Sequence, residues 1–149
     1  TCMGCKGSQV QILPSRPENV MSTITSHPVN SIQGRLTVPA DKSISHRALM
    51  LNAFAKGSAR IENVLTADDV LATLSALQAL GIDIQSNDEN TVLIQGGNGT
   101  FQATSSPLDC RNSGTGARLL MGLLAGQTFS VTITGDASLQ QRPMKRIIQ

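Results

Sequence analysis

The sequence contains no tryptophan or tyrosine and only three phenylalanines. Proteins that bind single-stranded nucleic acid stack bases on aromatic side chains, so this composition argues against such a surface. The net charge is only +2 at pH 7, which excludes a large basic face for nucleic acid. No apolar run approaches the roughly 18 residues that a membrane-spanning helix needs. We therefore expect neither a nucleic-acid partner nor a membrane partner.

Cysteine is also scarce, and three cysteines cannot build a disulfide framework. Cys2 and Cys5 form a single Cys-x-x-Cys without a second ligand pair, which is a weak zinc signal, and we expect no metal site. Cys110 is expected to be a small core residue. This cysteine usage is typical of a reducing compartment, so we expect a cytoplasmic location.

The first twenty residues differ from the rest of the chain. Residues 1–20 lack periodicity and lack the apolar core of a secretory signal peptide. Met21, followed by Ser22 and Thr23, resembles a translation start. We therefore expect residues 1–20 to be disordered or not native to the protein, and the domain to occupy residues 21–149.

Hydrophobic periodicity predicts one complete supersecondary unit over residues 32–97. Thr66 and Asp69 resemble a capping box that begins the second helix, whose leucines recur at helical spacing until Gly81. Gly57 is expected to close the first helix in the left-handed conformation. The predicted elements are a strand at 32–38, a helix at about 43–56, a strand at 59–64, a helix from 66 to 81, and strands at 82–85 and 91–95 joined by a loop at 87–90.

A second, incomplete unit is predicted over residues 106–149. Residues 112–117 open a helix over 118–125 that Gly126 ends, a strand follows at 129–134, and Pro143 suits the first turn of another helix. The order of elements repeats at a period of about 70 residues, which favours duplication over a coincidence between two amphipathic helices. The second unit stops before it is complete, so we expect the chain to be a fragment of something longer.

Three loops carry cations or glycines into helix starts. Residues 41–47 place a lysine, two serines and an arginine where unpaired N–H groups and the helix dipole favour a phosphate or carboxylate. Residues 111–116 supply glycines that allow close approach of a ligand, and residues 135–143 supply Arg142. Each loop alone is also compatible with an ordinary capped helix. Together, Lys42, Arg47 and Arg142 predict a shared anion pocket.

These three segments, in this order, resemble the N-terminal half of the 5-enolpyruvylshikimate-3-phosphate (EPSP) synthase family, the 3-phosphoshikimate 1-carboxyvinyltransferases, in their bacterial form. The resemblance covers residues 32–149. It implies an α/β (α+β) fold, an inside-out barrel-like globe of repeated β-α-β-α-β-β units, here one complete and one incomplete. It also implies transfer of the enolpyruvyl group of phosphoenolpyruvate to the 5-hydroxyl of shikimate 3-phosphate, with release of phosphate. This is a step of the shikimate pathway to chorismate and the aromatic amino acids.

The resemblance assigns roles residue by residue. Lys42 would contact both substrates, Ser43 and Arg47 would hold shikimate 3-phosphate, and Gly114 and Arg142 would hold phosphoenolpyruvate. Arg118 and Asn112 would support the site. Gly114 is the small residue expected of forms sensitive to glyphosate, which competes with phosphoenolpyruvate.

The family's main acid–base groups would lie beyond Gln149, so we expect no catalytic residue in this chain and little or no activity from it alone. Four carboxylates that match no family acid or base are expected to cap helices or hold turns: Asp41, Asp68, Asp69 and Asp136. The resemblance implies no cofactor and no metal, and a monomer at full length.

One departure and two alternatives remain at this point. Arg111 stands where the family usually has glycine; it could add an anion contact or spoil the loop, and a tolerated surface change is favoured. The sister enolpyruvyl transferase acting on UDP-N-acetylglucosamine usually has Lys-Asn in the first motif, whereas this chain has Ser43. A non-catalytic anion-binding fragment is the alternative from another class.

Overall fold

The computed structural model describes residues 25, 27–28, 30–31, 33–36, 38–88 and 90–148. The chain divides into two units, Thr1–Val38 and Pro39–Gln149, and each is described by itself. The expectation for residues 1–20 falls outside the described residues. The strand predicted over 32–38 is wrong for the described residues of that range, which lie in no strand and leave Leu36 67% and Val38 63% exposed. Alternating apolar residues become a strand only beside a partner strand.

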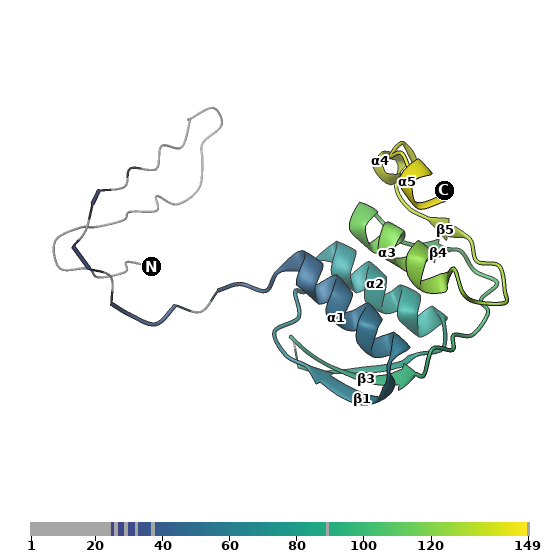
Figure 1. Ribbon diagram of the computed structural model, residues 1–149, viewed down its shortest axis with the longest axis horizontal. Coiled ribbons are helices and arrows are strands. Elements are labelled where there is room, and N and C mark those ends of the chain that lie inside the picture. The colour runs from purple at the N-terminus through teal and green to yellow at the C-terminus, as the bar shows by residue number, and fades with distance from the viewer. Residues whose placement is uncertain are drawn as a thin grey trace. The chain divides into compact units, whose positions relative to one another are not determined.

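The unit Pro39–Gln149 begins with two helices and a three-stranded sheet. Its sheet has the order β1-β3-β2, with both neighbouring pairs antiparallel. Figure 1 shows α1 and α2 side by side over one face of this sheet. The elements are α1 (Lys42–Phe54), β1 (Lys56–Ile61), α2 (Asp68–Ala79), β2 (Asp83–Asp88) and β3 (Thr91–Gly97).

Helix α1 begins as the sequence predicts but ends differently. The Asp41 carboxylate accepts the Ile44 N–H at 2.7 Å and so caps the helix. The helix ends at Ala55, which is extended and still donates to the Leu51 carbonyl at 3.0 Å. Gly57 does have a left-handed φ of 96°, but it is the second residue of β1 and does not close the helix.

The capping box predicted for α2 is wrong. The N-cap is Ala67, which makes no side-chain capping bond. Asp69 instead accepts its neighbour Val70 N–H at 3.0 Å, and its other oxygen is turned toward α1. Gly81, with φ of 85°, follows the end of α2 as expected.

The hairpin between β2 and β3 is tighter than the predicted loop over 87–90. Asp88 still pairs with Thr91, after a register shift between Ser86 and Asp88. Its carboxylate accepts the Asn90 N–H at 3.0 Å, which holds the turn.

The C-terminal part of the unit contains β4 (Leu108–Asp109), α3 (Gly114–Leu124), β5 (Ile133–Thr134), α4 (Ala137–Gln140) and α5 (Lys145–Ile148). Helix α3 starts four residues before the predicted start at 118, because the Ser113 hydroxyl accepts the Gly116 N–H at 3.0 Å. It ends at Leu124, and Gly126 has no positive φ. The strand predicted over 129–134 shrinks to two residues that pair in parallel with β4. The duplication of units stays a prediction.

The core lies between the helices and the sheet. Its largest fully buried side chains are Leu49, Val70, Leu77, Leu80, Ile94, Leu120 and a histidine, His46. Cys110 is buried as expected, and burial, with the neighbouring Asp109 charge, raises the pKa of its thiol to about 11. Apolar packing does not explain the imidazole of His46, which is 0% exposed.

Candidate functional site

A pocket of about 440 Å³ opens where the N-terminal ends of α1 and α2 meet the loop before α3. Three carboxylates and two cations stand in its wall together with an amide. The lining residues are Lys42, Ala67, Asp68, Asp69, Arg111, Asn112 and Asp136.

The ammonium of Lys42 is held at this pocket by Asp69. Its Nζ lies 2.6 Å from Asp69 Oδ2, with the lysine side chain 55% and the aspartate side chain 14% exposed. Burial alone would raise the pKa of Asp69, but the hydrogen bond and charge of Lys42 lower it below its ordinary value of 3.8. Asp69 is therefore ionised at neutral pH and acts as the counter-ion of Lys42 in the absence of ligand.

Asn112 joins the loop before α3 to a cation and a carboxylate. Its amide donates to Asp136 Oδ2 at 2.7 Å, and its Oδ1 accepts from Arg142 Nη2 at 2.7 Å. The hydrogen bond from Asn112, followed by that from the Leu139 N–H, lowers the pKa of Asp136. Asp136 also caps α4, as its sequence position predicts. Arg142 is thereby tethered beside the pocket that Lys42 lines.

Gly114, the first residue of α3, lies directly beneath two guanidinium groups. A methyl group added there would meet Arg142 Nη1 at 2.8 Å and Arg118 Nη1 at 3.1 Å. Arg118 donates to the Gly114 carbonyl at 3.3 Å and to the Pro143 carbonyl at 3.4 Å. Arg118 thus supports two loop backbones, while the absence of a side chain at Gly114 leaves room for Arg142.

Ser43 and Arg47 lie elsewhere on α1. They are four residues apart and share a face of the helix, with Ser43 half-buried and Arg47 exposed. Neither side chain makes a hydrogen bond or ion pair within the part of the chain that the structure describes. The structure therefore places Lys42 and Asn112 in the wall of one pocket, with Arg142 hydrogen-bonded to Asn112, whereas Ser43 and Arg47 do not line that pocket.

Arg111 adopts the left-handed conformation that glycine would adopt readily, with φ of 49°. Its N–H donates to Asp109 Oδ1 at 2.8 Å, and its guanidinium donates to Asp68 Oδ1 at 3.1 Å. The loop keeps its turn with an arginine in place, and the side chain is paired at the surface.

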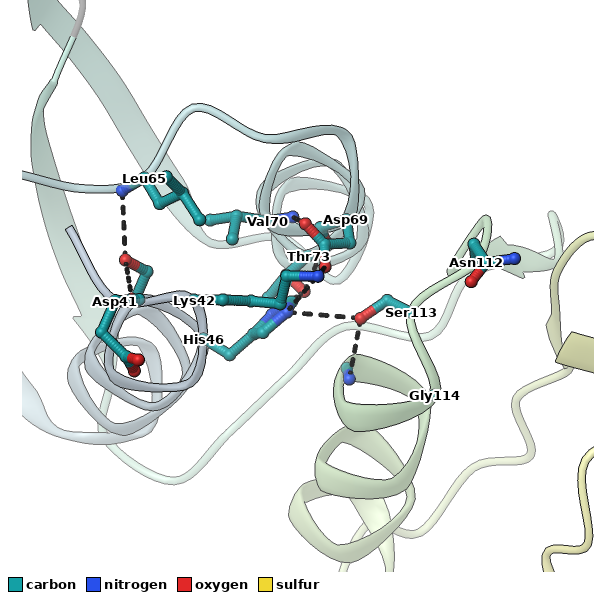
Figure 2. A network of polar contacts seen from close by, with 12 residues as sticks. Asp41, Lys42, His46, Leu65, Asp69, Val70, Thr73, Asn112, Ser113 and Gly114 are labelled. Atoms are coloured by element: carbon teal, nitrogen blue, oxygen red, sulfur yellow. Dashed lines mark hydrogen bonds and ion pairs between the residues drawn. The ribbon is translucent and has the colours of Figure 1, made fainter. Parts of the chain in front are cut away.

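Behind the pocket, His46 connects three helices. Figure 2 shows its ring between Thr73 of α2 and Ser113 at the start of α3, with Lys42 and Asp69 on the pocket side. Its Nδ1 lies 2.8 Å from Thr73 Oγ1, and its Nε2 lies 3.3 Å from Ser113 Oγ and 3.9 Å from Asp69 Oδ2. Burial lowers the pKa of His46 below 6.5, with Asp69 acting to raise it and Lys42 to lower it.

Over 38–88 and 90–148 and the shorter described stretches before them, no three His, Cys, Asp or Glu side chains gather as a metal site. In the same residues no helix is both long and apolar enough to cross a membrane.

Comparison with known proteins gives the family. The model of EPSP synthase (3-phosphoshikimate 1-carboxyvinyltransferase) matches residues 26–149. The chain belongs to the EPSP synthase family. The N-terminal ends of α1 and α3, where Lys42 and Gly114 lie, both fall within the matched residues.

Curated relatives and solved structures agree with this assignment. The 3-phosphoshikimate 1-carboxyvinyltransferase of Alkalilimnicola ehrlichii is 53% identical over 122 residues, which are 81% of this chain and 27% of that protein. That of Coxiella burnetii (strain CbuG_Q212) is 53% identical over 123 residues, 81% of this chain and 28% of that protein. The structure of EPSP synthase from Acinetobacter baumannii matches with a TM-score of 0.73 at 44% identity, covering 77% of this chain and 26% of its own. The chain thus spans little more than a quarter of these relatives.

Sequence patterns do not reveal the residues that lie behind Lys42 at this candidate site. Asp69 was interpreted as part of a cap, and His46 and Ser113 received no role. A usable signal existed for His46, because residues four apart on a helix share a face, and Lys42 and His46 are so spaced. No sequence signal placed α2 and α3 against that face.

Proposed function

We propose that the protein of which this chain is a part transfers the enolpyruvyl group of phosphoenolpyruvate to the 5-hydroxyl of shikimate 3-phosphate and releases phosphate. The observation that carries the proposal is that Lys42 and Asn112 line one pocket and Asn112 holds Arg142 at 2.7 Å, in a chain 53% identical over 122 residues to an enzyme of that name. Because the chain spans about a quarter of those enzymes, the activity is proposed for the whole protein.

The charges of the substrates explain the cations. Both substrates carry a phosphate and a carboxylate. Two unit charges 4 Å apart repel by about 4 kcal/mol at an effective dielectric constant of 20, so bringing the two molecules together requires opposing charge. Lys42 would exchange Asp69 for both substrates, and Arg142 would bind phosphoenolpyruvate above Gly114 with the fork geometry that suits carboxylate and phosphate.

Ser43 and Arg47 would hold shikimate 3-phosphate, and two other residues would support the site. The support for Arg47 is that its guanidinium is exposed and has no partner among the described residues. Arg118 would hold the loop backbones at Gly114 and Pro143, as it does in the absence of ligand. Asn112 would orient Arg142.

The reaction needs proton transfers that we assign to the part of the family sequence this chain does not span. A proton is added to the methylene carbon of phosphoenolpyruvate, and the 5-hydroxyl oxygen attacks the carbon that bears phosphate and loses its own proton. In the tetrahedral adduct the carbon–oxygen bond to phosphate then breaks, and a methyl proton leaves to restore the double bond. Each proton requires a group at hydrogen-bonding distance. Asp69 is unsuited as the acid, because it is ionised and paired with Lys42.

The wider features expected from the family complete the proposal. These are the barrel-like globe of β-α-β-α-β-β units, a cytoplasmic monomer without cofactor, and a domain at 21–149 with an incomplete second unit at 106–149. The α/β arrangement and the match to solved EPSP synthases support the first of these.

The test supplies the completed protein, this chain joined to the remaining length of its curated relatives, with phosphoenolpyruvate and one of two acceptors. We expect phosphate release with shikimate 3-phosphate and none with UDP-N-acetylglucosamine. The chain alone is expected to release no phosphate, and mixing it with a separately expressed remainder is expected to restore turnover. Robust turnover by the chain alone would refute the assignment of the proton transfers to the rest of the protein, and turnover with the sugar nucleotide would refute the proposed acceptor.

A further inference from the structure

The proposed reaction does not use His46, although its ring is a fully buried titratable group. It has 0% exposure and lies at the meeting of α1, α2 and α3. A buried polar ring is retained only where its nitrogens find partners, and both of these do.

The directions of the surrounding hydrogen bonds favour one position for the imidazole proton. The Gly116 N–H donates to Ser113 Oγ at 3.0 Å, so the Ser113 hydroxyl proton can be given to His46 Nε2 at 3.3 Å. On the other side, Thr73 Oγ1 lies 3.3 Å from the Asp69 carbonyl, which can only accept. Thr73 donates there and has a lone pair for a proton on His46 Nδ1 at 2.8 Å. Every group in this series of hydrogen bonds has a partner when Nδ1 is protonated and Nε2 is bare.

We infer that His46 is a positioning residue whose neutral, Nδ1-protonated imidazole fixes the Ser113 hydroxyl and so holds the Asn112–Gly114 turn that seats Arg142. The part of this inference that concerns ligand rests on the proposed function. The part that concerns the imidazole and Ser113 stands on the geometry of this chain.

The link from His46 to Arg142 is short. Ser113 is flanked by Asn112, whose Oδ1 accepts from Arg142 Nη2 at 2.7 Å, and by Gly114, directly beneath the same guanidinium. Loss of the Ser113 cap therefore disturbs the two residues that flank it, including Asn112, which holds Arg142. Lys42 is held separately by Asp69. Loss of His46 should therefore weaken binding of the ligand at Arg142 more than binding of the ligand on α1.

Protonation of the ring would break the arrangement. The charged groups that face it are Lys42 on its own helix and Asp69 on α2, and α3 contributes the uncharged Ser113. Burial lowers the pKa of His46, and an imidazolium Nε2–H could no longer accept from Ser113. Its attraction to Asp69 would grow at the same time.

The first test uses the 149-residue chain itself. Nitrogen-15 NMR of the imidazole at pH 7 should show a protonated Nδ1 and a bare Nε2 for His46. The opposite tautomer, or an imidazolium at that pH, would overturn the inference. This result does not depend on any substrate, so it separates the inference from the proposed function.

The second test uses the completed enzyme and two variants of one position. The amide of His46→Asn reaches only the Nδ1 position and loses Ser113, whereas that of His46→Gln reaches the Nε2 position and can still accept from Ser113. We expect the asparagine variant to raise KM for phosphoenolpyruvate about threefold to tenfold, as for one lost hydrogen bond, with the KM for shikimate 3-phosphate within about twofold. In the glutamine variant, the KM values for both substrates should be close to those of the wild type.

Ser113→Ala breaks the same link from the other side and guards against misfolding of a core variant. It should reproduce the KM pattern of His46→Asn, and the double variant should be no worse than either single variant. Equal effects on both KM values, failure of glutamine to rescue, or additive losses would overturn the positioning role.

Discussion

Substitution of Gly114 by alanine changes one contact in a known way. The new methyl group would lie 2.8 Å from Arg142 Nη1 and 3.1 Å from Arg118 Nη1, closer than side-chain carbons normally approach nitrogen. Both contacts are with the ends of flexible side chains, so the guanidinium of Arg142 moves by a few tenths of an ångström and the backbone of α3 stays in place. The hydrogen bond from Arg142 to Asn112, 2.7 Å long, is the interaction most exposed to this movement.

The same substitution should have opposite effects on stability and binding. Gly114 is the first residue of α3 and has no positive φ, so alanine should leave stability unchanged or raise it by up to about 1 kcal/mol. A misplaced charge-assisted contact costs about 1.5 to 3 kcal/mol, which predicts a loss of phosphoenolpyruvate affinity of about tenfold to a hundredfold. The added methyl group should also lower the affinity for glyphosate, which competes with phosphoenolpyruvate.

The assay is calorimetric binding of phosphoenolpyruvate and glyphosate to the completed enzyme, with urea unfolding of the chain alongside. Gly122→Ala is the matched control, because Gly122 is an exposed glycine of the same helix and its added methyl meets nothing within 4 Å. It should show the stability gain without the binding loss. Unchanged affinity and inhibition in Gly114→Ala, or equal losses in both variants, would refute the placement of Gly114 under Arg142.

Three further predictions concern the groups around the pocket. The folded-state pKa of His46 is depressed, so its contribution to stability is full above about pH 6.5 and falls as the pH drops below that value. The urea midpoints at pH 7.5 and pH 5.5 should therefore differ more for the wild type than for His46→Gln. An equal pH dependence in the two proteins would count against this. Asp69→Asn should lower the free energy of unfolding by no more than about 1 kcal/mol because Lys42 is half exposed, and a loss above about 3 kcal/mol would be inconsistent with such a pair. Arg111→Gly relieves a left-handed φ but loses the exposed pair with Asp68, so chemical denaturation should show between no change and a gain of about 1 kcal/mol, and a clear loss would oppose this reasoning.

Local patterns predicted most of the helices. The apolar spacing of α1 and α2, and the glycine after α2, act within one or two turns and are visible in the sequence. The strands at 32–38 and 129–134 were predicted in full, but their formation depends on partner strands that periodicity does not reveal. For the same reason, β4 was not predicted and the length of β5 was overestimated.

The site divides along a similar line. Lys42, Gly114 and Arg142 stand in recognisable loops, so their motifs could be found without coordinates. The counter-ion Asp69 and the ring of His46 act across helix contacts between α1, α2 and α3, and only the packing of those helices shows them.

The most direct measurement is phosphate release by the completed enzyme from shikimate 3-phosphate and phosphoenolpyruvate, with Lys42→Met and Arg142→Met compared with Lys56→Met. Lys56 is an exposed lysine at the start of β1 and serves as the charge-matched control. Loss of a cation that holds a bound phosphate or carboxylate should lower kcat/KM about a hundredfold or more in the first two variants and leave the third unchanged. Wild-type turnover that Lys42→Met or Arg142→Met retains within about twofold would contradict the account.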